Sequence, residues 1–362
     1  MTHDWMLVET LGEEPAVVAQ GDHTVDAVPV STFLRRNPHL MAVQTAIGET
    51  VRASSGLTSI TPKNHRVIRT EVVQMSDGRI HGVQIWLGAP DEEPPPRPTV
   101  GPLIWDLTEG TATDTRESLL IGGWDPDRQP THGRAFADDL PRRELKPSEA
   151  EVLSLIIEPQ AGVSICNTWD VTDHRGEQIT VGFVARSVPE VFDDGTERLI
   201  CRAMNWRSVR EGSSLQHDLL AEKIIAGLAE PGVHRALIDP RNWTLLKWLD
   251  DPVPFFDWRA GLVSAQTVHP DDRTTMAAMT AEFDSGTTSG VLRVVAENRG
   301  WTPVHVSVRR VELSAGIYAG LATLRTPTHA ELSAAGLDGD GPAERPRKTF
   351  SRKDRSARSS RP

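Results

Sequence analysis

The sequence predicts an α+β protein built from three tandem copies of one architecture, each an antiparallel sheet with helices packed on one face. Proline- and glycine-rich segments divide the 362 residues into three blocks of ordinary domain size. The first and third blocks share one order of strand-like and helical patterns: two strands, a helical region, then further strands. The middle block aligns with the third, since "DHRGEQITVGFVARSV" (173–188) matches "ENRGWTPVHVSVRRV" (297–311). Such internal similarity indicates diverged repeats.

The expected boundaries follow from this punctuation. The segment "DEEPPPRPT" is typical of a stiff, extended linker. A helical stripe stops at Pro231-Gly232, and periodicity is lost after about Thr326. The predicted organisation is an N-terminal domain over 1–90, a Pro-rich linker over 91–99, a middle domain over 100–210, a connecting helix over 213–230, a C-terminal domain over 231–326 and a disordered basic tail over 327–362.

The first block predicts a hairpin, a helix and a second hairpin. The opening strands are "DWMLVETLG" and "PAVVAQG", and residues 31–51 have the pattern of one continuous helix. One face of that helix is apolar, with Leu40, Val43, Ile47 and Val51. The closing strands "RVIRTEVVQM" and "RIHGVQIWLG" are joined by "SDG" at 76–78, a strong hairpin signal.

The other two blocks predict the same closing strands. The middle block ends in "VSICNTWDVT", "QITVGFVARSV" and "RLICRAMNW", whereas its two opening strands have the weakest signal. The third block opens with "HRALID" and "WTLLKWLD", continues with the helix "PDDRTTMAAMTAEF" and closes with three strands. In one of them Val304, Val306 and Val308 alternate with polar residues, which indicates a sheet with one face on a core.

Composition and charge exclude several classes of protein. The net charge is −11, yet residues 345–361 carry eight basic residues against Asp354 alone, so the rest of the chain is still more acidic. An acidic folded part argues against a specific nucleic-acid ligand, and the tail is interpreted as a solubilising extension rather than a tether to anionic lipid or nucleic acid. Two cysteines, no signal-peptide pattern and no apolar run of membrane-spanning length predict a cytoplasmic protein without a transmembrane segment.

The segment "VHPDDR" (268–273) combines a histidine, two carboxylates and an arginine. Pro270 suits the first position of a helix, and Asp271 and Asp272 then lie near the positive end of the helix dipole. A metal site would need further ligands, and the sequence has neither His-x-x-x-His nor Cys-x-x-Cys spacing. The favoured interpretation is a structural corner that begins a helix, with His269 unexplained.

The same region carries a family resemblance. "FFDWR" (255–259), "VHPDDR", a helix and "GVLRVVAENRGWTPVHVSVRRVEL" resemble the HPDDR-containing type of PAS sensor domain, with Arg293 and Trp301 at matching positions. The whole chain resembles an actinobacterial, mycobacterial-type family of tandem PAS/GAF-like domains without an attached output domain. "THDWMLVETLG", "TFLRRNPHL", "SITPKNHRVIRTE", "THGRAFADDLPRREL", "RAMNW" and "GLAEPGVHRALIDPRNWTLLKWLD" carry that likeness. The resemblance implies PAS/GAF-like sensor domains, and no cofactor is predicted. The photoreactive Asn-Cys-Arg-Phe run of flavin-binding PAS domains is absent. Haem is not expected either, because His269 belongs to a helix start and not to an apolar helical face.

Catalytic and nucleotide-binding signatures are absent from the sequence. Ligand contacts are therefore sought among polar and aromatic residues at inward strand positions. Asn167 and Trp169 share one strand face, and Asn205 lies on the inner face of another. The competing interpretation, which is favoured, is that each asparagine satisfies the backbone of a neighbouring loop. Trp248 and Trp258, near Trp243, are the other candidate ligand contacts, with plain core packing as the favoured alternative.

These observations predict a non-enzymatic sensory protein that binds a small metabolite and acts through a protein partner carrying the output function. A ligand-free interaction scaffold and an enzyme with an unrecognised site are the alternatives. The connecting helix has an apolar stripe that is expected to pack on the chain's own domains, with pairing in a homodimer as the alternative. The stripe consists of Leu215, Leu219, Leu220, Ile224, Ile225 and Leu228.

Overall fold

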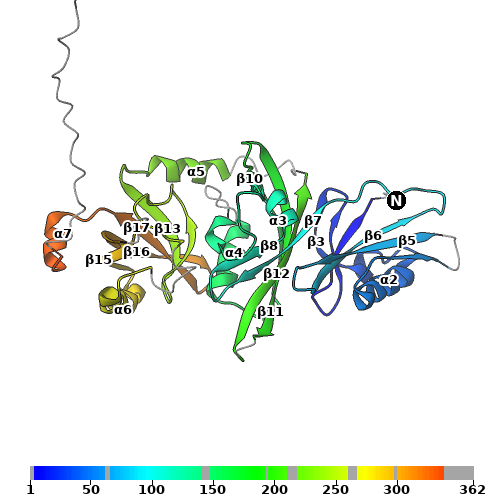
Figure 1. Cartoon of the computed structure of the whole chain (residues 1–362), viewed down its shortest axis with the longest axis horizontal. Helices are drawn as coiled ribbons and strands as arrows, with labels where there is room; N and C mark the ends of the chain where they lie inside the picture. Colours follow the sequence, from blue (N-terminus) through cyan, green and yellow to red (C-terminus); the bar gives the residue numbers. More distant parts are fainter. Residues whose placement is uncertain are drawn as a thin grey trace, which may run out of the picture.

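The structure, a computed structural model, contains three sheets that follow one another along the long axis of the molecule (Figure 1). The described residues are 4–61, 66–140, 147–192, 195–209, 218–259, 267–296 and 300–337. All pairs of neighbouring strands are antiparallel. The α+β prediction of three sheet-and-helix domains is confirmed.

The N-terminal domain has a six-stranded sheet in the order β3-β2-β1-β6-β5-β4, with helices on one face. Its elements are β1 (Met6–Glu9), β2 (Ala16–Gln20), β3 (His23–Pro29), α1 (Val30–Phe33), α2 (Leu40–Ala53), β4 (Leu57–Ile60), β5 (Val67–Gln74) and β6 (Ile80–Gly88). The predicted hairpin joins β5 to β6, with Gly78 at φ 85°, a conformation that favours glycine.

The middle domain also has six strands, in the order β10-β11-β12-β7-β8-β9. Its elements are β7 (Val100–Asp106), β8 (Thr111–Asp114), α3 (Arg116–Ile121), β9 (Arg134–Ala135), the 3-10 helix η1 (Phe136–Asp138), α4 (Pro147–Ile157), β10 (Ser164–Thr172), β11 (Gln178–Val191) and β12 (Glu197–Ser208).

The C-terminal domain has five strands in the order β14-β13-β17-β16-β15. The connecting helix α5 (Asp218–Gly227) precedes this domain. The elements of the domain are β13 (Val233–Asp239), β14 (Thr244–Trp248), the 3-10 helix η3 (Pro270–Asp272), α6 (Arg273–Glu282), the 3-10 helix η4 (Phe283–Ser285), β15 (Thr287–Val295), β16 (Trp301–Ser314), β17 (Ile317–Arg325) and α7 (His329–Ala334).

One strand order underlies all three sheets. Each domain shares five strands with the others, namely its first two and its last three along the chain. If these five are numbered 1 to 5 in chain order, their order across the sheet is 2-1-5-4-3 in every domain. β3 and β9 are additions, and both extend the edge beside the second strand. The same architecture is thus present three times, including in the middle domain, where the opening strands were hard to recognise.

The sheets of neighbouring domains stack face to face. One hydrophobic cluster joins Leu7 and Val73 of the first sheet to Met204 and Trp206 of the second. The contact is close, because a Cβ added at Gly82 would lie 2.7 Å from Met204 Sδ. A second cluster joins the inner face of the middle sheet and α4 to the outer face of the third sheet. The N-terminal and middle sheets are therefore covered on both faces.

Two local predictions were wrong. The continuous helix over 31–51 is interrupted between α1 and α2, where Pro38 cannot continue a helix and restricts Asn37 before it. The disordered tail does not begin at 327, because Thr328 and Glu331 form a capping box that begins α7. Leu332 of α7 is buried. The basic residues from 345 onward lie outside the described residues.

The structure describes only part of the predicted connecting helix, and Leu215 and the side chains of Leu219 and Leu220 lie outside the described part. Ile224 and Leu228 are 53% and 62% exposed, so the expected packing of the stripe on the chain's own domains does not hold for these two. The helix is held instead through its backbone, where the Ile225 carbonyl accepts a hydrogen bond from Arg235 (2.7 Å). Among the described helices, none has the length and apolar character needed to cross a bilayer.

Candidate functional site

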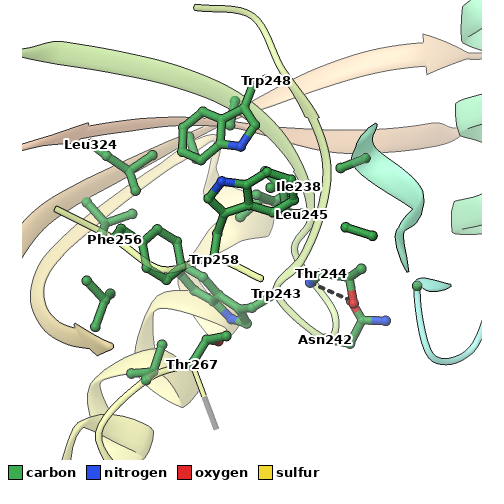
Figure 2. Close-up of a pocket in the computed structure, with 18 of the residues that line it drawn as sticks. Ile238, Asn242, Trp243, Thr244, Leu245, Trp248, Phe256, Trp258, Thr267 and Leu324 are labelled. Atoms are coloured by element: carbon green, nitrogen blue, oxygen red, sulfur yellow. Dashed lines mark hydrogen bonds between the residues drawn. The ribbon is translucent and has the colours of Figure 1, made fainter. Parts of the chain in front are cut away.

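A cavity of about 240 Å³ lies in the C-terminal domain between the inner face of its sheet and the segments that cover it (Figure 2). The floor consists of apolar side chains from every strand of the sheet. These include Ala236, Ile238, Leu245, Leu292, Val294, Val306, Ala322 and Leu324. The alternation of apolar and polar residues that predicted a half-buried sheet thus supplies the apolar floor of a binding pocket.

Four aromatic side chains form a wall beside this floor: Trp243, Trp248, Phe256 and Trp258. Trp248 belongs to β14 of the sheet itself. The rings of Trp248 and Trp258 meet nearly edge to face, with centroids 6.2 Å apart, a favourable aromatic geometry. Both side chains are at most 9% exposed. The pocket therefore combines an aliphatic floor with an aromatic wall.

A tight turn between β13 and β14 places Trp243 in this wall. Trp243 has φ 61°, a conformation that non-glycine residues rarely adopt. Two bonds hold the turn: Trp243 N donates to the Asp239 carbonyl (2.8 Å), and Thr244 N donates to Asn242 Oδ1 (3.0 Å). The indole of Trp243 donates through Nε1 to Thr280 Oγ1 (2.8 Å), which ties the turn to α6.

The Trp248 indole differs from that of Trp243. Trp248 is only 2% exposed, so its Nε1 atom is shielded from solvent, and this atom has no hydrogen-bond partner. Figure 2 shows this nitrogen on the side of the ring that faces Trp258. An unsatisfied N–H of this kind costs free energy unless something in the pocket accepts its hydrogen bond.

The middle domain completes the cavity. Glu109, Gly110, Ala135 and Ala137 belong to the segments around β8, β9 and η1, and all four line the pocket. Phe136 N donates to the Gly110 carbonyl (2.9 Å), which holds the two segments together. A molecule in the pocket would therefore contact two domains at once.

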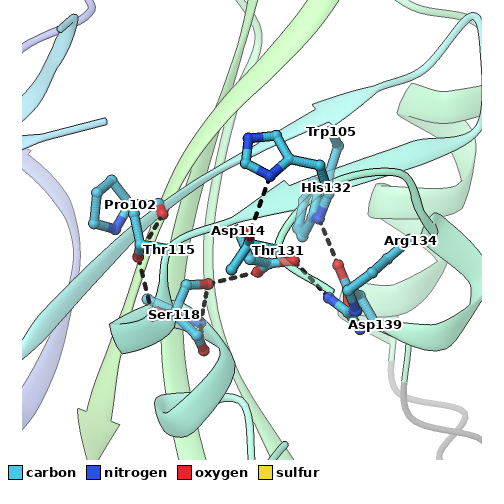
Figure 3. A network of polar contacts seen from close by, with 10 residues as sticks. Pro102, Trp105, Asp114, Thr115, Ser118, Thr131, His132, Arg134 and Asp139 are labelled. Atoms are coloured by element: carbon cyan, nitrogen blue, oxygen red, sulfur yellow. Dashed lines mark hydrogen bonds and ion pairs between the residues drawn. The ribbon is translucent and has the colours of Figure 1, made fainter. Parts of the chain in front are cut away.

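A buried polar network lies directly behind this wall (Figure 3). Arg134 forms ion pairs with Asp114 and Asp139, both at 2.5 Å. Trp105 Nε1 also donates to Asp139 (3.0 Å), and Ser118 Oγ donates to Asp114 (2.7 Å). Burial raises the pKa of Asp139 to about 7, against the opposing effect of Arg134. The network fixes the start of η1, and with it Ala135 and Ala137.

The structure separates the five predicted ligand contacts. Trp248 and Trp258 line the cavity, whereas Asn167, Trp169 and Asn205 do not. The amide of Asn205 donates to the Ser118 carbonyl (3.1 Å), and Asn167 Oδ1 accepts from Thr168 N (2.8 Å). Both asparagines thus bond backbone groups, but these groups belong to α3 and to β10 itself and not to a neighbouring loop, as the favoured interpretation had it.

Trp169 belongs to the middle-domain core, where its ring lies 4.1 Å from that of Phe183 and 6.3 Å from that of Trp105. Phe256 and the middle-domain wall were missed. Phe256 carries a local signal, since it stands in the "FFDWR" segment beside Trp258. Ala135 and Ala137 carry none, because their contact with the pocket arises only when the two domains dock.

The "VHPDDR" segment is a structural corner, as predicted. Pro270 begins η3, and His269 caps it by accepting a hydrogen bond from Asp271 N at Nδ1 (3.2 Å). Asp272 accepts from the backbone N of Arg293 (2.6 Å) and pairs with its guanidinium, which lowers the carboxyl pKa. His269 is thus explained. In the described part of the chain, no group of three or more His, Cys, Asp or Glu side chains has the geometry to hold a metal ion.

Family models match the three domains in order. A model described as Rv3651-like, N-terminal covers residues 4–96, one described as Rv3651-like, middle domain covers 99–208, and one described as Rv3651-like, C-terminal domain covers 218–335. Among curated proteins, none matches the chain.

A crystal structure of a protein from Mycobacterium tuberculosis is 51% identical in sequence and superposes with a TM-score of 0.84, covering 93% of this chain and 100% of that one. Two other solved structures match weakly. A sensory box histidine kinase/response regulator from Burkholderia thailandensis has 12% identity and a TM-score of 0.22, over 36% of this chain and 88% of its own. An RNA-binding light-oxygen-voltage receptor has 8% identity and a TM-score of 0.25, over 66% of this chain and 98% of its own.

Proposed function

The chain belongs to the Rv3651-like family, and from that premise we propose that it is a sensory protein that binds a small, mostly apolar molecule in its C-terminal domain. The observation that carries this proposal is the cavity of about 240 Å³ with an aromatic wall. Ligand sites in proteins are typically concave, largely apolar and equipped with few polar groups, and this cavity has that character.

The proposed signal passes through the shared wall. A ligand acts only if it binds two conformations with different affinities. Ala135 and Ala137 line the pocket, while Arg134 and Asp139 beside them belong to the buried network of the middle domain. Occupancy of the pocket would therefore favour one placement of η1 over another. A partner protein that contacts the middle domain would register the difference.

The test begins with the full-length chain produced in an actinobacterial host and analysed by native mass spectrometry, followed by thermal-shift screening of metabolites. We expect a retained small molecule, or stabilisation by one chemical class. The variant Ala322→Leu places a larger side chain in the cavity and is expected to abolish both effects. Ala278→Leu is the matched control, because Ala278 is exposed on α6 of the same domain.

The proposal fails if the wild-type chain retains nothing and no metabolite stabilises it. It also fails if Ala322→Leu, shown by circular dichroism to be folded, binds as well as the control. The first result would favour an interaction scaffold with no ligand.

A further inference from the structure

The polar groups around the pocket restrict the chemistry of its occupant. Of the described residues that line the cavity, Glu109 is the single charged one. Its side chain is 56% exposed and pairs with Arg198 (3.3 Å), which places it at the rim. An anionic ligand would lose its hydration inside the cavity without meeting a lining cation, a cost that buried charges tolerate only when paired. The described lining thus disfavours carboxylates and phosphates.

The unpartnered Trp248 indole points to the complementary feature of the ligand. Its Nε1–H is a donor only, so it requires an acceptor. Its aromatic neighbour Trp258 is at best a weak one. Trp243, on the same wall, already donates to Thr280, whereas the buried Nε1 of Trp248 has no partner and therefore has an N–H to offer.

The size of the cavity sets a further limit. At about 240 Å³ it lies just below the range of about 300–1,000 Å³ that is usual for drug-sized ligands. The occupant is therefore a compact molecule, comparable to one substituted ring.

Building on the proposed function, we propose that the pocket selects small uncharged compounds that carry one hydrogen-bond acceptor, a carbonyl or ether oxygen, which receives the hydrogen bond of Trp248 Nε1. The apolar floor and the aromatic wall hold the hydrocarbon part of the ligand. The indole N–H orients the oxygen and distinguishes the ligand from a plain hydrocarbon.

Three probes of nearly equal size and shape test this selectivity on the full-length chain. Acetophenone has the carbonyl acceptor, α-methylstyrene replaces that oxygen with a methylene group, and benzoate adds a negative charge. Binding is measured by ligand-observed NMR titration, since molecules of this size bind with dissociation constants of about a millimolar or tighter. The hydrocarbon is less well hydrated than the ketone, so the decisive quantity is the change in their affinity ratio between variants.

We expect Trp248→Phe to weaken acetophenone relative to α-methylstyrene by about threefold to tenfold, the range for one neutral hydrogen bond. Trp301→Phe, which removes an indole that is 40% exposed and does not line the cavity, should leave that ratio unchanged. Retained binding of α-methylstyrene by Trp248→Phe shows that the variant is folded and its pocket intact. Benzoate should bind at least tenfold more weakly than acetophenone.

The inference is overturned if Trp248→Phe weakens both neutral probes equally, or if benzoate binds as well as acetophenone. In either case the proposed function survives, provided that Ala322→Leu still abolishes binding of the probes. If neither neutral probe binds the wild-type chain at millimolar concentration, both the inference and the assignment of the pocket fail.

Discussion

Lys247 and Glu149 form an ion pair between two domains. Lys247 Nζ lies 2.6 Å from Glu149 Oε2, and the two side chains are 1% and 2% exposed. Lys247 comes from β14 of the C-terminal domain and Glu149 from α4 of the middle domain. Charges so deeply buried are tolerated when they are paired.

Lys247→Met should lower the free energy of unfolding by about 3–5 kcal/mol, because it leaves the Glu149 carboxylate buried without the ammonium group. Urea unfolding at neutral pH measures the loss. The double variant Lys247→Met/Glu149→Gln should recover most of it. Lys223→Met, at an exposed lysine of α5, should change stability by no more than about 0.5 kcal/mol. Equal losses in the single and double variants would contradict this account.

His81 is a buried neutral histidine between the first two domains. Its Nδ1 donates to the Ala203 carbonyl (2.8 Å), and its Nε2 accepts from Arg202 (3.1 Å). Burial, together with the positive charges of Arg202 and Arg79 and against the negative charge of Asp77, lowers its pKa to about 4. Glu190, which pairs with Arg202, is the other acidic group nearby.

The lowered pKa predicts a pH dependence with a definite sign. Below about pH 6.5 the unfolded chain binds a proton at this histidine, whereas the folded chain does so only near pH 4. The stability contributed by neutral His81 is therefore present at pH 7 and is lost as the pH falls from about 6.5 to 4.

Relative to His81→Asn, whose amide can keep the bond to Ala203, the wild-type chain should lose up to about 3 kcal/mol of stability between pH 7 and pH 4. Urea unfolding of both proteins across this range measures the difference. Parallel stability curves would show that His81 is not a buried neutral group.

At the scale of single elements, α7 shows how a short helix forms in sequence that resembles a tail. Thr328 Oγ1 accepts from Glu331 N (3.3 Å), and Glu331 Oε2 accepts from Thr328 N (2.7 Å). Arg325, at the end of β17, forms two hydrogen bonds with the Glu331 carboxylate, which lowers the pKa of that group. The cap and the ion pair fix the helix against the sheet.

Thr328→Ala should destabilise α7 by about 1 kcal/mol, which corresponds to roughly fivefold faster amide exchange at residues 331–335. Hydrogen exchange followed by mass spectrometry measures the rates. Thr326→Ala, an exposed threonine before the helix, serves as the control. Equal acceleration in both variants would mean that the cap does not hold the helix.

Across the whole molecule, the stacked sheets make neighbouring domains depend on each other. Leu246 belongs to the C-terminal domain, yet it is fully buried in the cluster that includes Leu153 and Ile156 of α4. Val304, equally buried, lies on the inner face of the same sheet and belongs to the cluster around the pocket. The two positions compare a shared core with a core internal to one domain.

Leu246→Ala should cost about 2–5 kcal/mol and accelerate amide exchange in α4 as well as in β14. Val304→Ala should accelerate exchange in β15 and β16 and leave α4 protected. Hydrogen exchange with mass spectrometry distinguishes the two patterns. If α4 responds alike to both substitutions, the middle and C-terminal domains do not couple through the shared cluster.

Local patterns predicted the strands and hairpins because these depend on near neighbours in the chain. Val304, Val306 and Val308 alternate in the sequence and all point into one core. The interruption near Pro38 was also readable, since proline restricts its own backbone and that of the residue before it. It was missed because the apolar periodicity on either side outweighed it.

The candidate site was only partly predictable. Trp248 and Trp258 stand out as large aromatic residues near the opening of the third block, and both line the cavity. Asn205 and Trp169 occupy equally inward positions in the middle domain, where α3 and neighbouring rings fill the space in front of them. An inward strand position therefore does not distinguish a pocket from a packed core.

The sequence by itself determined the three repeats, the antiparallel sheets and the helix start at Pro270, because each follows from periodicity and turn chemistry within a few residues. Only the tertiary structure decided where a cavity remains and which residues close it. Ala137 and Trp248 are far apart in the chain and share a pocket because two sheets stack. Such contacts depend on the fit of whole surfaces, which no local pattern encodes.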